Sequence, residues 1–236
     1  ALTGSYAKKL SERSALSIGI KYIYSSLLVK QSLYGMSLAP INTFAADIYY
    51  YHSGKKYEGQ NAWLNYGASL TNIGGKVSYD DYAQRNFQPT TLRVGLAQHL
   101  ALGYKNTLAL SLDSYRLLIP TPPVRNSDGT VVKGKDPETI SALGTIVESW
   151  SAAPDGFSET LKEINYNLGA ELTLQNLLTL RAGYFYQNKD KGNMQFVTLG
   201  LGLKLRKVGL DMSYLVPTRE NNPLAHTLRF GINLGF

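Results

Sequence analysis

The sequence has no cysteine and no long apolar run. Because none of the 236 residues is a cysteine, a disulfide framework, a thiol nucleophile and a thiolate metal site are all excluded. No stretch of 18 or more apolar residues occurs, which excludes a transmembrane helix. Histidine is scarce as well, and His99 has no second ligand at a spacing that suits a metal. We therefore expect neither a metal nor another cofactor.

The charge and the composition limit the class of protein further. The formal net charge is +7 at pH 7, and nucleic acid is the usual first partner to consider for a basic chain. Here the lysines and arginines are spread over turns and strands without a basic helix or run. We therefore expect anionic lipid or lipopolysaccharide, and no nucleic acid, as the counterpart. The 22 glycines and 17 tyrosines suit a membrane barrel with a polar lumen and aromatic girdles.

Strict alternation of apolar and polar residues is the strongest pattern in the chain. In residues 226–236 every second position from Leu228 to Phe236 is apolar, which places these side chains on one face of a β-strand. A tilted strand of about 9–11 residues crosses a bilayer. The segment contains Phe230 and ends on Phe236, and it is similar to the sorting signal read by the bacterial outer-membrane assembly machinery.

The same alternation recurs along the whole chain and predicts about eleven strands. Charged residues fall on the polar faces of these strands, whereas a small soluble barrel fills its interior with apolar side chains. We therefore predict an all-β fold, namely a transmembrane, antiparallel, up-and-down outer-membrane β-barrel that forms a single domain over residues 1–236. The predicted strands cover residues 2–10, 16–24, 44–50, 64–71, 92–99, 108–113, 164–174, 178–186, 197–205, 208–214 and 226–236.

The lengths of the connections predict the orientation of the strands. If Phe236 lies on the periplasmic side, alternate connections should be short, and those at 9–14, 52–61, 103–106, 175–176 and 206–207 are mostly short. The other connections are mostly longer and are expected outside the cell. The first strand runs toward a short turn, so an even strand number leads us to expect an odd number of strands before Ala1. The long connections are 26–43, 72–89, 119–162, 188–193 and 217–224.

The longest insertion, residues 119–162, is expected to be partly helical and extracellular. Asp136 and Pro137 resemble the N-cap and the first residue of a helix. Apolar residues then recur at helical spacing from Ile140 to Trp150, which predicts an amphipathic helix of about three turns. Such an insertion is either a lid or docking surface for a partner, or a loop that merely seals the mouth of the barrel.

Aromatic residues of the long loops are the candidate contacts with a partner. Trp150 and Phe157 in the insertion would anchor a bound protein. Tyr82 and Phe87 lie between charges in the connection 72–89. These two residues would either contact a partner or belong to the interfacial aromatic belt.

Charged residues on the polar faces of the strands form a second candidate group. Unpaired buried charge is costly, so we expect these residues to pair inside the lumen, with ligand binding or conduction as the alternative. Serine and histidine also fall on inward faces, which leaves a hydrolase open. The G-x-S-x-G motif is missing from the sequence, and we assign no catalytic residue. The lumen charges are Arg93, Asp113, Glu171 and Arg181.

Several segments of the chain resemble segments of the PorV family and follow one another in the order found in that family. Members of the family are outer-membrane components of the Bacteroidetes type IX secretion system and are related to FadL-type channels. The resemblance implies a FadL-like barrel of about 14 strands in the full protein, of which about 11 are recognisable and three would be missing. The segments are Trp63–Tyr79, Leu117–Pro123, Leu180–Tyr186, Lys191–Asn193, Gly209–Pro217 and Asn222–Phe230.

The resemblance implies a function that is not enzymatic. Members of the family bind the C-terminal signal domain of secreted cargo at the large outer-membrane translocon barrel. They then deliver the cargo to a surface sortase, which removes the signal and attaches the cargo to lipopolysaccharide. The translocon barrel, the cargo signal domains, the sortase and lipopolysaccharide are therefore the implied partners. Two alternatives stay open: a channel for hydrophobic solutes, and a deacylase of lipopolysaccharide or lipid A.

Overall fold

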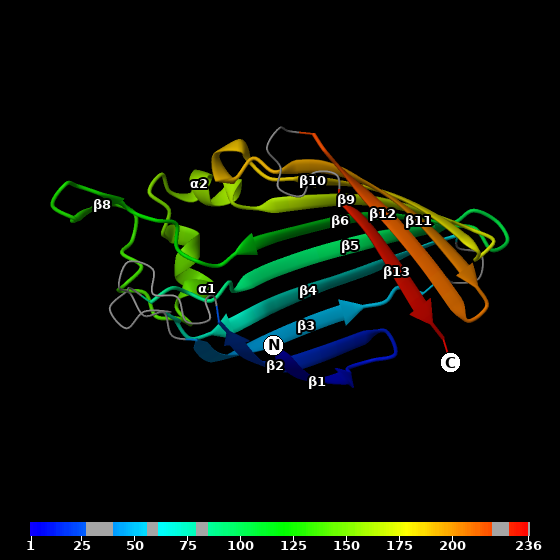
Figure 1. Ribbon diagram of the computed structural model, residues 1–236, viewed down its shortest axis with the longest axis horizontal. Coiled ribbons are helices and arrows are strands. Elements are labelled where there is room, and N and C mark those ends of the chain that lie inside the picture. Colours follow the sequence, from blue (N-terminus) through cyan, green and yellow to red (C-terminus); the bar gives the residue numbers. More distant parts are fainter. Residues whose placement is uncertain (27–39, 56–60, 79–84, 219–226, 236) are drawn as a thin grey trace. The chain divides into compact units, whose positions relative to one another are not determined.

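The protein is an antiparallel β protein in the computed structural model (Figure 1), which describes all residues except 27–39, 56–60, 79–84, 219–226 and 236. Eleven strands form one sheet in the order β1-β2-β3-β4-β5-β6-β9-β10-β11-β12-β13, and β7 and β8 form a separate pair. Within the described residues, β1 and β13 are the edge strands of the large sheet. The predicted all-β, antiparallel, up-and-down arrangement is confirmed.

The strands follow the predicted alternation closely. Strand β10 coincides with its predicted range, and β6 extends four residues further, to Leu117. The strands of the large sheet are β1 (Leu2–Lys9), β2 (Ser14–Ser25), β3 (Ile41–His52), β4 (Ala62–Gly74), β5 (Thr91–Ala101), β6 (Thr107–Leu117), β9 (Asn165–Leu174), β10 (Leu178–Tyr186), β11 (Gln195–Leu205), β12 (Val208–Pro217) and β13 (Leu228–Leu234).

The insertion between β6 and β9 carries the remaining elements. It contains the hairpin β7 (Val124–Arg125) and β8 (Val131–Lys133) and the helices α1 (Thr145–Glu148) and α2 (Phe157–Lys162). A 3-10 turn, η1 (Ser149–Ser151), continues α1, and a second one, η2 (Lys189–Lys191), follows β10. None of the helices in the described part of the chain has the length and the apolar character needed to span a membrane.

The predicted three-turn helix that starts at Asp136 is wrong. Asp136 does accept a hydrogen bond from the backbone N–H of Glu138 at 3.0 Å, as an N-cap would. However, the Thr139 hydroxyl donates to the Asp136 carbonyl oxygen at 2.8 Å, and the Ser141 hydroxyl accepts from the backbone N–H of Gly144 at 2.9 Å. Short polar side chains that bond to their own backbone favour turns over a helix interior. The helix therefore begins only at Thr145.

Contacts divide the chain into two compact units. The first unit consists of Ala1–Tyr50, Ala68–Arg93 and Arg116–Leu161, and the second consists of Tyr51–Gly67, Val94–Tyr115 and Lys162–Phe236.

In the first unit a buried carboxylate joins three strands. Asp47 of β3 is 2% exposed and lies 3.1 Å from the Lys21 ammonium of β2. Asp47 also accepts hydrogen bonds from the backbone N–H of Asn72 in β4 and from the Tyr49 hydroxyl. Asn72 has a φ of +56°, a left-handed conformation that Asn tolerates better than most residues. Because the charge of Asp47 is paired and hydrogen-bonded, its burial is compatible with a stable fold.

In the second unit one face of the sheet is apolar and exposed. Leu201 of β11 lies opposite Leu180 of β10 and Met212 of β12, and Met212 lies opposite Phe230 of β13. These four side chains are between 41% and 74% exposed. A contiguous exposed apolar surface of this extent is unusual for a soluble monomer and is typical of the lipid-facing side of a membrane sheet.

Candidate functional site

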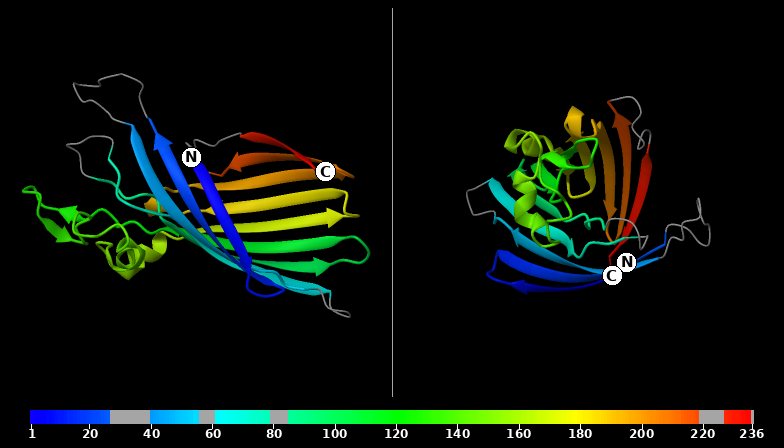
Figure 2. Two further views of the ribbon diagram at one scale, coloured as in Figure 1. Left: turned by 90° about the horizontal axis from the view of Figure 1, so that it is seen from below. Right: turned by 90° about the vertical axis from the view of Figure 1, so that its left-hand side faces the viewer.

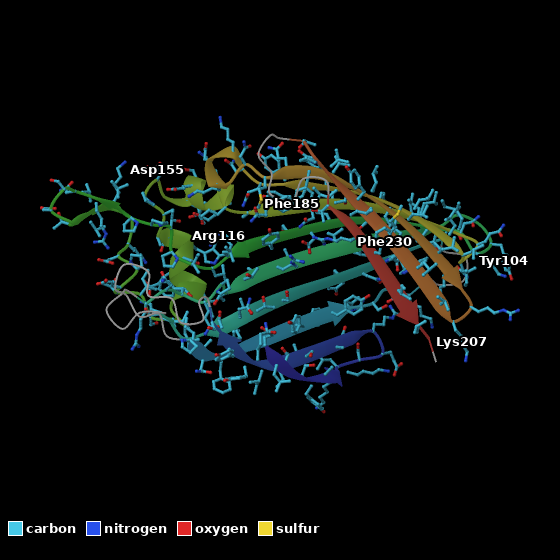
Figure 3. All side chains as sticks on the ribbon, viewed as in Figure 1. Tyr104, Arg116, Asp155, Phe185, Lys207 and Phe230 are labelled. Carbon is cyan, nitrogen blue, oxygen red and sulfur yellow. The ribbon has the colours of Figure 1, made fainter. Side chains whose placement is uncertain are left out.

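The rim insertion, defined here as residues 118–161, is attached to the end of β6 by a buried arginine. Arg116 is 2% exposed. Its Nη2 donates to the carbonyl oxygen of Ser149 at 2.8 Å, and its Nη1 donates to the Ser149 hydroxyl at 3.4 Å. The guanidinium also lies 4.5 Å from the centre of the Trp150 ring. A desolvated cation over an aromatic ring contributes about 2 kcal/mol, so the contact between Arg116 (labelled in Figure 3) and Trp150 helps to hold the insertion in place.

The interior of the rim insertion is small and fully hydrogen-bonded. Ile140 and Ala152 are buried, and three hydroxyl-bearing residues, Thr145, Ser149 and Thr160, are buried beside them. The Thr145 hydroxyl donates to the carbonyl oxygen of Ala142 at 2.8 Å, and the Thr160 hydroxyl donates to that of Trp150 at 3.4 Å. Because the buried hydroxyls are satisfied within the insertion, it forms an ordered surface. Figure 2 shows α1 and α2 close to each other.

Two pairs of large apolar side chains point away from this interior. Leu143 and Val147 are 65% and 74% exposed, and Phe157 and Leu161 are 61% and 46% exposed. Each pair is four residues apart, and in a helical turn such residues lie on one face. Leu143 was expected on a single apolar stripe together with Ile140, but Ile140 is buried and Leu143 is not. Exposed apolar groups on an ordered segment are typical of a protein-binding surface.

The connection after β4 is joined to the rim insertion by a lysine. The Lys76 ammonium donates to the carbonyl oxygen of Pro137 at 2.8 Å and lies 4.4 Å from the centre of the Phe87 ring. Val77 and Asn86 exchange two backbone hydrogen bonds at 2.8 and 2.7 Å, which brings Phe87 back toward Lys76. Phe87 is half-buried. The other aromatic candidate of this connection, Tyr82, lies outside the described residues.

Ion pairs of low burial surround the rim insertion. Arg125 bonds to Asp136 at 3.0 Å, and Lys135 bonds to Glu148 at 3.3 Å. The backbone N–H of Glu138 lowers the pKa of Asp136 below its ordinary value, and the Arg125 charge lowers this pKa further. Exposed pairs of this kind contribute little to stability, about 0–1 kcal/mol each. The two exposed apolar pairs, Leu143 with Val147 and Phe157 with Leu161, are therefore the distinctive feature of the surface of the insertion.

Charged residues on the polar faces of the strands form a cross-strand network in the second unit. Arg181 of β10 donates from Nε to Glu171 of β9 at 2.7 Å and from Nη1 to Asp211 of β12 at 2.7 Å. The sequence predicted pairing among the lumen charges without naming the partners, and Arg181 forms ion pairs with Glu171 and Asp211. Asp113 of β6 accepts a 2.9 Å hydrogen bond from Asn167 of β9. Arg93 is exposed on β5 and belongs to the first unit.

An aromatic stack that the sequence did not single out fills the polar side of the second unit near the ends of its strands. Phe185 is 6% exposed, and its ring centre lies 4.7 Å from that of Phe196 and 6.4 Å from that of Tyr115. Of the three residues, only Phe185 lies within a predicted strand, on its polar face, and this placement was the available signal for the stack. Of the two expected assembly residues, Phe230 is 74% exposed on β13 (Figure 3), and Phe236 lies outside the described residues.

The histidine at position 99 takes part in a structural contact. Its ring stacks on Trp63 with a centre-to-centre distance of 5.0 Å, and its Nε2 lies 3.1 Å from the Asn65 amide nitrogen. Within the part of the chain that the structure describes, no group of three His, Asp or Glu residues could hold a metal ion.

These observations define a class of protein. It is an antiparallel membrane β protein whose strands expose an apolar face and in which an ordered insertion follows β6. The family model described as "Type IX secretion system protein PorV" matches residues 1–124, slightly more than half of the 236 residues. The chain therefore belongs to the PorV family and is an outer-membrane component of the type IX secretion system. The matched part covers β1 to β6 and ends before α1. No curated protein matches the chain.

Proposed function

We propose that the protein is a non-enzymatic receptor that binds the C-terminal signal domain of secreted cargo at the translocon and carries it to the surface sortase. Membership of the PorV family supports a role in this secretion system. In the proposed orientation the C-terminus lies on the periplasmic side, and the long loops, with the rim insertion, lie at the cell surface. Lipopolysaccharide then surrounds the receptor as the lipid to which the cargo is finally attached.

One observation supports the rim insertion as the binding surface: its two exposed apolar pairs, Leu143 with Val147 and Phe157 with Leu161. A few apolar and aromatic anchors supply most of the free energy of a protein interface. The bond between Arg116 and Ser149 fixes the insertion before a partner arrives. Less conformational entropy is then lost on binding, which raises the affinity.

The test is a pull-down of a purified cargo signal domain with variants of the full chain. The double variants Leu143→Glu with Val147→Glu, and Phe157→Glu with Leu161→Glu, place charge on the surface and should weaken binding at least tenfold, or about 1.4 kcal/mol. The matched control is Leu102→Glu, because Leu102 is 50% exposed and lies at the short connection between β5 and β6. Unchanged binding by both double variants would contradict the proposal. Conversion of lipid A by the purified protein would contradict the non-enzymatic part.

A further inference from the structure

A hollow of about 380 Å³ lies on the polar face of the second unit, beside the turn between β11 and β12. Figure 3 shows Lys207 at the tip of this turn. The lining combines strand residues of β10 to β13 with the turn itself. Its charged members are Arg181, Lys204, Arg206, Lys207 and Asp211.

A glycine in the floor of the hollow allows the charged side chains to meet. A Cβ atom on Gly202 would lie 2.8 Å from the Asp211 carboxylate oxygen and 2.9 Å from Nη1 of Arg181. These separations are too short for a carbon atom, so a side chain at this position would displace the ion pair. Asn233 adds a 3.0 Å hydrogen bond to the other oxygen of Asp211. The ion pair of Arg181 and Asp211 therefore occupies the space above Gly202 and forms part of the floor of the hollow.

The charges that line the hollow are unbalanced. Arg181 is neutralised by Glu171 and Asp211, each at 2.7 Å. By contrast, the side chains of Lys204, Arg206 and Lys207 make no ion pair with any residue that the structure describes. Three cations of one sign around a single hollow repel one another. A bound anion would remove this repulsion.

The conformation of Arg206 is a second, independent indication. Its φ is +47°, a left-handed conformation in which Gly and Asn are favoured over residues with long side chains. A two-residue turn between strands is normally made of residues such as Asn and Gly. Here the chain places Arg206 and Lys207 in the turn at a cost in conformational energy. Lys105 has a similar conformation in the turn between β5 and β6, and what distinguishes Arg206 is that its turn borders the hollow.

We propose that this hollow binds a phosphate-bearing anion. Arginine and lysine are the side chains that proteins use to hold phosphate, and the Thr179 hydroxyl in the lining is a further donor. Lys204, Arg206 and Lys207 together with the group of Arg181, Glu171 and Asp211 have a net charge of +2. A phosphate group, which carries close to two negative charges and three acceptor oxygens, balances this charge better than a single carboxylate does. The phosphate belongs either to a lipid headgroup or to a soluble compound. This inference is independent of cargo binding, because it concerns no residue of the rim insertion.

The test uses the full chain in detergent and two probes. Binding of inorganic phosphate is measured by equilibrium dialysis, and retention of phosphatidylglycerol against phosphatidylcholine is measured by native mass spectrometry. Arg206→Asn removes the charge and relieves the strained backbone, so the thermal midpoint should not fall while phosphate affinity falls at least fivefold. Lys204→Gln should lower the affinity similarly.

Lys105→Asn is the matched control, because Lys105 also has a positive φ, +63°, in the turn between β5 and β6 and lies outside the lining of the hollow. It should leave phosphate binding unchanged. Selective retention of phosphatidylglycerol that phosphate displaces would identify a lipid headgroup, and phosphate binding without such retention would identify a soluble ligand. Failure to bind either probe, or equal losses in Arg206→Asn and Lys105→Asn, would overturn the proposal.

Discussion

The guanidinium of Arg116 donates a 2.8 Å hydrogen bond to the carbonyl oxygen of Ser149, 33 residues further along the chain. This bond and the contact with the Trp150 ring join the end of β6 to the rim insertion. A buried charge-assisted hydrogen bond contributes about 1.5–3 kcal/mol, and the aromatic contact adds to it. The ordered state of the insertion therefore depends strongly on one residue.

Arg116→Ala is expected to loosen the rim insertion without unfolding the sheet. The loss of the hydrogen bonds and of the contact with Trp150 should cost on the order of 3 kcal/mol of local stability. Limited proteolysis would detect faster cleavage within residues 140–160. Arg125→Ala is the control, since Arg125 forms an exposed pair with Asp136, and its cleavage pattern should match the unaltered protein. Equal protection of the insertion in both variants would show that Arg116 does not hold it.

Leu201→Arg is expected to destabilise the sheet. Leu201 lies on the exposed apolar face between Leu180 and Met212, and an arginine that faces lipid near the bilayer midplane costs about 2–4 kcal/mol. The temperature at which the folded band is lost in electrophoresis would report the change. Lys204→Leu, on the polar face, should leave this temperature nearly unchanged. The opposite order of the two effects would show that the faces have been exchanged.

Gly202→Ala is expected to displace the pair formed by Arg181 and Asp211. The added methyl group would lie less than 3 Å from the ends of both side chains. Both ends are partly exposed and would move apart, which removes an ion pair that contributes at most about 1 kcal/mol. Gly231→Ala is the control, because a Cβ there would approach Asp211 to only 3.7 Å, an ordinary contact. Thermal unfolding of the two variants in detergent should therefore differ, and identical midpoints would refute the role given to Gly202.

The loop 188–193 is expected to loosen in acid. Lys162 lies 2.8 Å from Asp190, and its hydrogen bond and charge lower the pKa of Asp190 below the ordinary 3.8, with a smaller effect of Lys189 and Lys191. A carboxylate with a lowered pKa stabilises the folded state above its unfolded pKa, and the contribution is lost as the pH falls through the folded pKa. The hydrogen-exchange protection factor of the loop, which corrects for the intrinsic exchange rate, should therefore fall below about pH 4.

Asp190→Asn is the control for this acid transition. It removes the titrating group of this pair and should make the acid loss of protection smaller in the same range, while the second ion pair of the loop, Lys191 with Glu163 at 3.0 Å, is retained. A loop that loosens equally in the variant would assign the transition to another group.

The sequence predicted the strands well because one face of a membrane sheet contacts lipid and the other contacts the polar lumen. Apolar and polar residues therefore alternate along each strand. Residues 178–186 were predicted as a strand, and β10 has these same bounds. Arg181 and Glu171 both fall on polar faces of neighbouring strands, so the pattern predicted pairing among such charges but did not name this pair. The contact of Arg181 with Asp211 did not follow, because it needs the cross-strand register of β11 and the space over Gly202.

The insertion was predicted poorly because its structure depends on contacts distant in sequence and on local hydrogen bonds of short polar side chains. Apolar spacing from Ile140 to Trp150 is compatible with a helix, but the bonds made by Thr139 and Ser141 do not appear in that spacing. Trp150 was expected to anchor a partner, which stays a prediction. Its ring packs against Arg116, a residue whose burial no local pattern signals.

The side chains that hold the rim insertion, Arg116 and Lys76, both lie within residues 1–124, the part that the PorV family model matches. What they hold, the carbonyl oxygens of Ser149 and Pro137, lies beyond it. A carbonyl oxygen is present in every residue. These two hydrogen bonds therefore do not depend on which side chains the insertion carries at positions 137 and 149. Ser149, through its hydroxyl, and Trp150, through its ring, are therefore the positions of the insertion at which a substitution would disturb its attachment to Arg116.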